Sequence, residues 1–100
     1  ILGTPDYIAP EQIASSRQAD TRADIYSLGC TLFFLLTGRP PFSAATVAAK
    51  LAAHESTPLP RIDELRNDLP PRLVQVLHRM TAKRPEERYA TPGDVAVALA

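Results

Sequence analysis

One long apolar run, Ile25–Leu36, constrains the fold of this chain more than any other feature. Thr21 precedes it with Asp24 three residues later, which is the layout of a capping box, and Gly38 follows as a helix stop. The run is apolar on nearly every face, and such a helix is buried on all sides in a larger structure. A helix of about sixteen residues is roughly 24 Å long. Since 100 residues can hardly cover such a rod, the sequence hints that covering material is missing.

Ten prolines divide the rest of the chain into short pieces, because proline starts or stops helices. Residues 1–9 and 57–67 are predicted to be loops. The apolar spacing predicts a short helix at 10–14, and further helices at 44–55, 70–82 and 92–100 around a central helix at 24–37. Ser43 is the predicted cap of the second of these helices, and Thr91 with Pro92 opens the last. No segment alternates like a strand, so we predict an all-α fold with long loops.

Composition excludes several classes of function. Apolar residues make up 45% of the chain, which argues against disorder. Eleven basic residues balance eleven acidic ones, so the chain has no net positive charge that would attract nucleic acid or an anionic membrane. The stretch Leu28–Leu36 is too short to span a bilayer, and no signal peptide is present. Cys30 has no disulfide partner and is predicted to be a small buried residue. His54 and His78 lack neighbours at metal-ligand spacing. We expect a cytoplasmic chain without a metal site.

The segment Gly-Thr-Pro-Asp-Tyr-Ile-Ala-Pro-Glu, residues 3–11, resembles the end of the protein kinase activation segment. In that family the stretch forms a substrate-docking loop followed by an Ala-Pro-Glu motif. The positions of the docking loop in this chain are Gly3, Thr4, Pro5 and Tyr7. An Ala-Pro-Glu tripeptide alone means little, but here it follows Gly-Thr-Pro-x-Tyr and precedes four further matches in family order.

Those four matches extend the resemblance over almost the whole chain. They are residues 24–29 at the start of the family's central buried helix, 37–42 at its exit, 80–88 in the loop before the final helix, and 91–92 at the start of that helix. The chain therefore resembles the C-terminal lobe of a eukaryotic-like serine/threonine protein kinase domain. Its residues 11–12 and 26–30 are similar to bacterial membrane-anchored kinases. The resemblance implies that residues 1–100 are one partial domain, the C-terminal helical half of a kinase fold.

The resemblance also implies roles for individual residues. Glu11 and Arg88 would form the family's buried ion pair, which ties the docking loop to the helical base. Asp24 has two interpretations, as the closing acid of the capping box or as the family's anchor for the backbone of the catalytic loop. The Thr4 hydroxyl would close the site around a Ser or Thr substrate. As a plain turn residue, Thr4 would instead only precede Pro5 in extended geometry.

Two positions depart from the family pattern. The family usually places Asp where this chain has Arg84, so a local cap for the following turn is lost. Many relatives that prefer basic substrates have Glu where Phe34 stands, and Phe34 cannot pair with a basic side chain. A preference for Arg or Lys upstream of the target hydroxyl is therefore not expected.

The residues that perform phosphoryl transfer are absent from the 100 residues. That reaction needs cradled phosphates, bound magnesium and an oriented nucleophile. The four glycines are not spaced as Gly-x-Gly-x-x-Gly, neither lysine lies in a Val-Ala-x-Lys strand, and no His-Arg-Asp or Asp-Phe-Gly occurs. We expect no catalytic, cofactor-binding or metal-binding residue in this chain. ATP and Mg2+ would bind the missing N-terminal part of the domain, upstream of Ile1.

Two hypotheses of different classes remain open. In the first, the chain is a fragment of an enzyme that transfers the ATP γ-phosphoryl group to Ser or Thr of protein substrates. In the second, it is a non-catalytic, kinase-derived helical module that binds proteins. An upstream reading frame with His-Arg-Asp and Asp-Phe-Gly would favour the first, and a start codon near Ile1 the second. Neither predicts contact of this segment with nucleic acid or membrane, although the parent protein can be anchored elsewhere.

Overall fold

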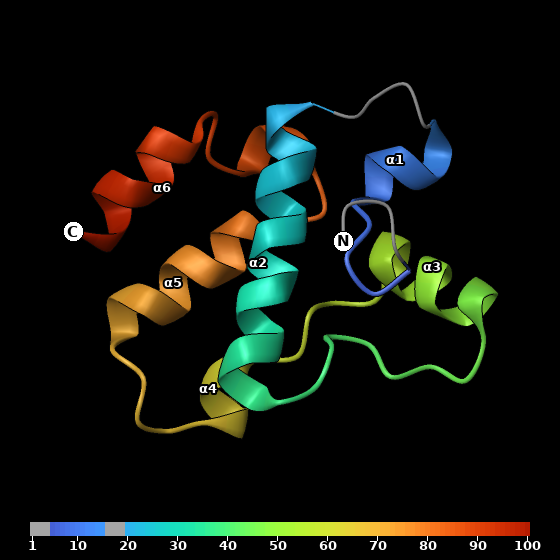
Figure 1. The fold of residues 1–100 in the computed structure, drawn as a ribbon, viewed down its shortest axis with the longest axis horizontal. Helices are drawn as coiled ribbons and strands as arrows, with labels where there is room; N and C mark the ends of the chain where they lie inside the picture. The colour runs from blue at the N-terminus through green and yellow to red at the C-terminus, as the bar shows by residue number, and fades with distance from the viewer. Residues whose placement is uncertain (1–4, 16–19) are drawn as a thin grey trace.

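The described part of the chain is built from helices and loops (Figure 1). The structure is a computed structural model that describes residues 5–15 and 20–100. Its helices are α1 (Pro10–Ala14), α2 (Thr21–Thr37), α3 (Val47–Ser56), α4 (Ile62–Leu65), α5 (Pro71–Met80) and α6 (Pro92–Leu99), with a 3₁₀ turn at Pro85–Glu87. No strand occurs within these two ranges, and the all-α prediction is confirmed.

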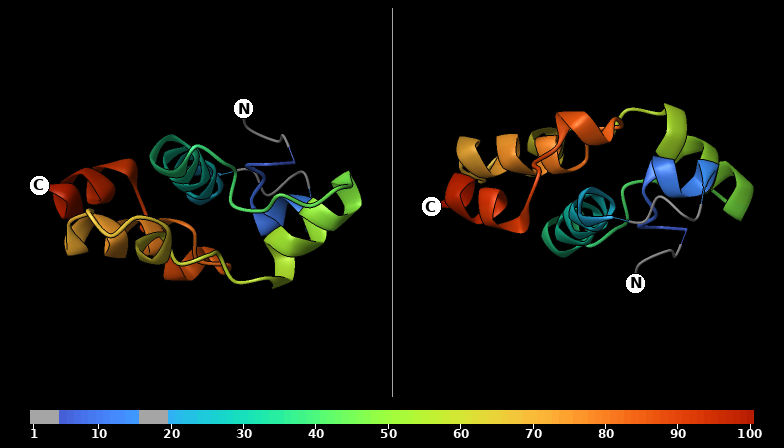
Figure 2. Two further views of the ribbon diagram at one scale, coloured as in Figure 1. Left: turned by 90° about the horizontal axis from the view of Figure 1, so that it is seen from below. Right: turned by 90° about the horizontal axis from the view of Figure 1, so that it is seen from above.

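Helix α2 is the longest helix described and runs through the middle of the molecule, as predicted. Helices α5 and α6 lie on one side of it, α1 and α3 lie on the other, and α4 lies near its C-terminal end (Figures 1 and 2). Gly38 ends α2 with φ of 78° and donates its backbone N–H to the carbonyl of Phe34. A left-handed residue at this place favours glycine because glycine has no Cβ to clash.

The core forms three clusters around α2, each on a different face of the helix. Ile25 packs against α5 and α6, Tyr26 and Cys30 pack against Ala9 and the segment before α1, and Phe33 packs against α4 and α5. The three clusters have no residue in common, and α2 contributes to each of them. Its position fixes where the N-terminal segment sits relative to α5 and α6.

The predicted caps of two helices were wrong. Asp20, and not Thr21, caps α2, because its Oδ1 accepts hydrogen bonds from the backbone N–H groups of Arg22 and Ala23 at 3.0 and 3.2 Å. A carboxylate here also meets the positive end of the helix dipole. Thr46, and not Ser43, caps α3 by accepting from the N–H of Ala49. This cap delays the start of α3 to Val47.

One predicted loop contains a short helix, and the last helix begins as predicted. The predicted loop 57–67 contains the single-turn helix α4, whose Ile62 is buried against Phe33. Burial of one large apolar side chain explains why a turn forms where two prolines predict none. The last helix matches its prediction, since Thr91 Oγ1 accepts from the N–H of Asp94 at 3.1 Å and Pro92 begins α6.

Residues 5–15 and 20–100 leave part of α2 uncovered, although a helix apolar on nearly every face is expected to be buried all round. Leu28, Phe34 and Leu35 are 54%, 39% and 71% exposed. Leu28 and Leu35 are seven residues apart and so share one helix face. A groove of about 240 Å³ lies beside Leu28, between α2 and α6, and its other lining residues are Asp24, Ile25, Pro92, Val95, Ala96 and Leu99.

Candidate functional site

The predicted docking loop is described only in part. Gly3 and Thr4 lie outside the described residues, whereas Pro5 and Tyr7 lie in a half-buried turn before α1. The turn is fixed to α2 by Ser27, whose Oγ donates to the carbonyl of Tyr7 at 2.6 Å. The Tyr7 side chain packs against the cluster that contains Tyr26 and Cys30. The turn is thus held against the N-terminal half of α2.

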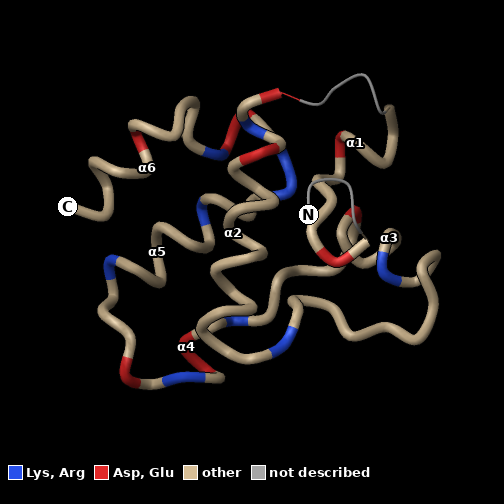
Figure 3. Tube along the Cα trace, viewed as in Figure 1, with Lys and Arg blue, Asp and Glu red and all other residues tan. Residues whose placement is uncertain are grey.

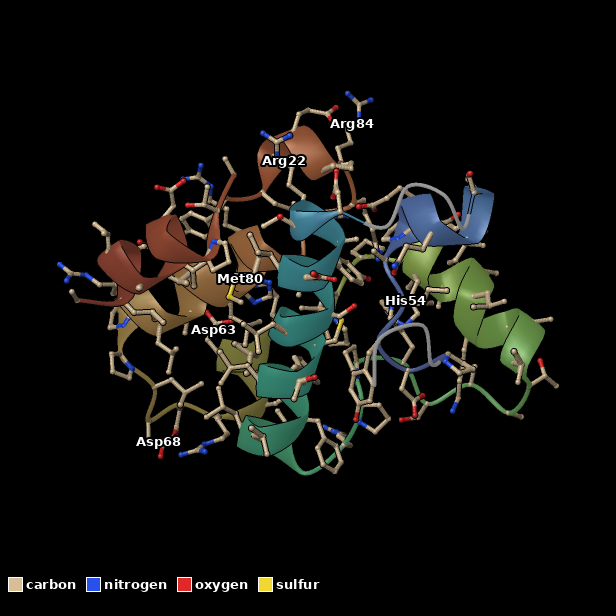
Figure 4. All side chains as sticks on the ribbon, turned by 45° about the horizontal axis from the view of Figure 1, so that its top comes forward. Arg22, His54, Asp63, Asp68, Met80 and Arg84 are labelled. Carbon is tan, nitrogen blue, oxygen red and sulfur yellow. The ribbon has the colours of Figure 1, made fainter. Side chains whose placement is uncertain are left out.

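Helix α3 holds the same turn from its other side. Lys50 Nζ lies 2.8 Å from Asp6 Oδ1, with both side chains partly exposed. One helical turn later, the ring of His54 is fully buried, and its Nδ1 lies 2.7 Å from Tyr26 Oη. Figure 4 shows His54 between α3 and the segment that leads into α1. The turn at residues 5–7 therefore lies between α2 and α3, and it contacts residues of both helices that are far from it in the sequence.

The structure brings together Glu11 of α1 and Arg88, which follows the 3₁₀ turn. Arg88 Nη1 and Nη2 donate to the two carboxylate oxygens of Glu11 at 2.6 and 2.9 Å. The Arg88 side chain is completely buried and that of Glu11 is 9% exposed. A bidentate pair of this kind is strong because both hydrogen bonds are charge-assisted.

The remaining donors of Arg88 bind backbone carbonyls from two other segments. Nε donates to Ala82 at 2.7 Å, Nη1 to Arg22 at 3.0 Å, and Nη2 to Lys83 at 3.1 Å. The guanidinium also lies 4.8 Å from the ring centroid of Tyr26. All five N–H groups of the guanidinium are thus used, and Arg88 joins α1, the first turn of α2 and the loop after α5.

Arg84 does not take the place of Arg88 in this pair. It is exposed, precedes the 3₁₀ turn, and makes no side-chain capping hydrogen bond (Figure 4). Asp24 is also exposed, beside the groove between α2 and α6, and its side chain has no hydrogen bond within residues 5–15 and 20–100. Because Asp20 caps α2, the capping-box interpretation of Asp24 is wrong.

Burial sets the protonation of the groups near the turn at residues 5–7. Desolvation raises the pKa of Tyr26 well above its usual range and raises that of Cys30 to about 12, so both stay neutral. Desolvation lowers the pKa of His54 to about 4 and that of Lys83 to about 8. Cys30 is fully buried, as predicted, and its neutral thiol is no nucleophile.

The sequence patterns do not predict the contacts that α3 makes with the turn at residues 5–7. In the sequence, His54 stands out only as a histidine without neighbours at metal-ligand spacing, and Lys50 only as a lysine outside a Val-Ala-x-Lys strand. Their spacing of four residues places both side chains on one face of α3, and this spacing indicates that they can share a contact. Which residues that face contacts depends on the tertiary structure. In the described ranges, no group of three or more His, Cys, Asp or Glu side chains is arranged to hold a metal ion.

Figure 3 shows acidic and basic residues interspersed along the trace, in line with their equal numbers. No described helix is long and apolar enough to cross a membrane.

Known protein sequences are similar to this chain over nearly its whole length. The sequence profile of the family described as Protein kinase domain matches residues 1–96. The chain is 43% identical to serine/threonine-protein kinase PknD of Mycobacterium tuberculosis over 97% of its length. It is 40% identical to PknH of Mycobacterium bovis over 97%, and 45% identical to Pkn1 of Myxococcus xanthus over 91%. The chain spans only 15%, 16% and 13% of the length of these three relatives.

Proposed function

This chain belongs to the protein kinase domain family, and we propose that it is the helical base and substrate-docking segment of a serine/threonine protein kinase. The proposed parent transfers the ATP γ-phosphoryl group to Ser or Thr of proteins. Its nucleotide and Mg2+ sites lie outside these 100 residues, which contain no Gly-x-Gly-x-x-Gly, His-Arg-Asp or Asp-Phe-Gly. The three kinases named above, all described as serine/threonine-protein kinases, support this specificity.

The buried pair between Arg88 and Glu11 is the observation that carries the proposal. It anchors α1 directly after the turn that contains Pro5 and Tyr7. A substrate segment that docks on this turn needs a rigid support, because productive phosphoryl transfer depends on a fixed distance between hydroxyl and phosphate. Arg88 gives that support by joining the docking segment to α2 and to the loop after α5. In the proposed enzyme this chain positions the substrate, and the missing half performs the chemistry.

Thr4 and Asp24 complete the proposal. The Thr4 hydroxyl is proposed to face the substrate Ser or Thr, and Asp24 to accept hydrogen bonds from the backbone of the catalytic loop. The exposure of Asp24 beside an apolar groove leaves its carboxylate free to accept such bonds. Phe34 is 39% exposed and offers no charge to a basic substrate.

The test is phosphate transfer by the complete protein that contains these residues. With labelled ATP and Mg2+, we expect phosphoserine and phosphothreonine, but no phosphotyrosine, in a protein substrate. The 100-residue chain alone is expected to transfer nothing and to bind no Mg-ATP. Phosphate incorporation by the isolated chain, with contaminating kinases excluded, would contradict the proposal that the catalytic residues lie outside these 100 residues. Phosphotyrosine as the main product would contradict the specificity.

The groove between α2 and α6 favours a second candidate, a non-catalytic protein-binding module. Its apolar lining and the exposed Leu28 and Leu35 suit a protein partner better than solvent. This candidate predicts a complete protein that binds no ATP and transfers no phosphate. Calorimetric titration of the complete protein with Mg-ATP separates the two, since only the kinase gives a binding isotherm.

A further inference from the structure

The turn at residues 5–7 is held by two helices, α2 and α3, which both come later in the chain. Helix α2 holds the backbone of the turn through Ser27, whose Oγ donates to the Tyr7 carbonyl at 2.6 Å. Helix α3 holds it through Lys50, whose Nζ lies 2.8 Å from Asp6 Oδ1. The half-buried side chain of Tyr7 also packs against the cluster that contains Tyr26 and Cys30. Its position therefore depends on where α3 sits.

His54 fixes the position of α3 against α2. Its ring is completely buried, its Nδ1 lies 2.7 Å from Tyr26 Oη, and its centroid lies 5.0 Å from that of Phe42 in an edge-on contact. The second ring nitrogen, Nε2, is buried without a hydrogen-bond partner of good geometry. The backbone of Pro5 and Asp6 approaches the ring closely enough to favour its protonated form. His54 thus lies between Tyr26 and the turn.

A purely structural role explains this histidine poorly. Burying an imidazole costs desolvation, and a leucine would fill a similar volume without that cost. What the imidazole adds is a hydrogen bond to α2 on one edge and a polar edge toward the backbone of the turn on the other. Lys83 works in the same direction, because its Nζ donates to the carbonyl of Ala53, next to His54, at 3.3 Å. The C-terminal half of α3 is therefore fastened at two adjacent residues.

We propose that Lys50 and His54 are positioning residues, through which α3 sets the place of the substrate-docking turn and hence the affinity of the kinase for its protein substrate. Lys50 acts on the turn through Asp6, and His54 acts through Tyr26 and the backbone of residues 5–6. Neither residue touches the reacting atoms. The inference rests on the proposed function of the turn and extends it to a helix that the motifs do not include.

A double-mutant cycle in the complete protein tests the Lys50 contact. Lys50→Met and Asp6→Asn each remove the ion pair, and each is expected to raise the KM for protein substrate by about fivefold or less, the worth of one partly exposed ion pair. The KM for ATP should stay unchanged, and the double variant should be no worse than either single variant. Glu55→Gln on the same helix is the matched control, because Glu55 is exposed and has no partner in the described residues. Additive effects would overturn the coupling between the two residues.

His54 is tested by a conservative and a non-conservative replacement. His54→Asn keeps an acceptor near the position of Nδ1 for Tyr26 Oη, whereas His54→Leu fills the space without one. We expect His54→Leu and Tyr26→Phe to raise the KM for protein substrate, and His54→Asn to restore most of the wild-type value. A structural role alone would lower the active fraction, and hence the apparent kcat, without changing KM. That result, or equal effects of Asn and Leu, would overturn the proposal.

Hydrogen exchange separates this proposal from the proposed function. In Lys50→Met and His54→Leu proteins, the backbone amides of residues 6–9 should exchange faster, while those of α5 stay at the wild-type rate. If the wild-type protein transfers no phosphate but this change occurs, the kinase assignment fails and the positioning of the turn stands. If exchange at residues 6–9 does not change, the positioning role is wrong whatever the activity.

Discussion

Arg88 shows how one side chain can hold several segments together. Its charge lies in a fully buried place, which is tolerable only because Glu11 neutralises it and three carbonyls use the other N–H groups. Replacing a buried ion pair by apolar residues is often neutral, but removing one partner leaves an uncompensated charge. Replacement of Arg88 is therefore expected to change the stability of the fold much more than replacement of the exposed Arg84 in the same loop.

Replacement of Arg88 is predicted to destabilise the fold strongly. Arg88→Met leaves the Glu11 carboxylate buried without a partner and should lower the free energy of unfolding by roughly 3–5 kcal/mol. Arg84→Met is the matched control, since Arg84 is exposed, and should change it by about 0.5 kcal/mol or less. Urea unfolding of the kinase domain that contains these residues measures both. Equal effects of the two variants would contradict the assigned role of Arg88.

His54 is predicted to make stability depend on pH. Its pKa is about 4 in the fold against 6.5 without the fold, because burial and Lys83 disfavour the charged ring, while Asp6 opposes this in part and the neighbouring Tyr26 stays neutral. The unfolded chain therefore binds the proton first. Stability is complete above pH 6.5 and falls as the pH drops from 6.5 to 4, by about 3 kcal/mol in all.

The comparison with His54→Asn isolates this effect. The pKa of His78 is also lowered by burial, so His78 contributes with the same sign in both proteins. The difference between wild type and variant, from urea midpoints at several pH values, should shrink as the pH falls. A difference that is constant between pH 7 and pH 4.5 would show that His54 does not titrate in this window.

At the scale of elements, the crossing of α2 and α5 depends on the absence of a side chain at residue 29. A Cβ on Gly29 would lie 2.6 Å from Thr81 Cγ2 and 3.0 Å from Met80 Cβ. Thr81 cannot easily turn away, because its Oγ1 donates to the Leu77 carbonyl at 2.9 Å. Gly29 therefore lets the end of α5 approach α2 more closely than alanine would.

Alanine replacements at two glycines are predicted to have opposite effects. Gly29→Ala should destabilise the fold by roughly 1–3 kcal/mol through overpacking. Gly93→Ala in α6 is the matched control, because its Cβ would meet nothing nearer than Thr91 Oγ1 at 3.6 Å. It should stabilise the fold by about 0.4–1 kcal/mol, since the unfolded chain loses freedom. Thermal unfolding of both variants checks the signs, and stabilisation by Gly29→Ala would contradict the close crossing.

At the scale of the whole molecule, apolar surface on α2 and α6 has no cover among the described residues. Leu99 of α6 is 46% exposed and lines the groove beside the exposed Leu28 of α2, and Val97 of α6 is 76% exposed. Each large side chain left uncovered forgoes roughly 1.5–3 kcal/mol of burial, against about 5–15 kcal/mol for a whole domain. Surface of this kind drives association.

The 100-residue chain, expressed alone, is accordingly predicted to be marginally stable and to self-associate. Sedimentation velocity over a concentration series should show growth of the average mass. Changing Leu28→Glu and Leu35→Lys together should reduce it, because both side chains are largely exposed. Val47→Lys is the control, since Val47 is 58% exposed but lies on α3, away from this surface. A monodisperse monomer with a sharp melt would contradict the prediction and favour the binding-module hypothesis.

The sequence by itself determined the features that depend on local chemistry. The apolar run and Gly38 predicted the central helix, Thr91 with Pro92 predicted the start of α6, and a lone Cys30 in an apolar run predicted burial. Helix propensity, proline and glycine act within a few residues, so they can be read along the chain. The motifs from residue 3 to residue 92 likewise indicated the kinase family without coordinates.

Only the tertiary structure decided what each helix face meets. The caps at Asp20 and Thr46 and the turn α4 depend on which of several local options packs best, and spacing alone does not choose between them. Lys50 and His54 contact the turn at residues 5–7, although they lie more than forty residues from it in the sequence. Contacts of that separation arise from the burial of apolar faces around α2, because the free energy of burial depends on all the elements packed together. The sequence therefore indicated the kinase family, and the packing around α2 revealed how α3 contacts the turn at residues 5–7.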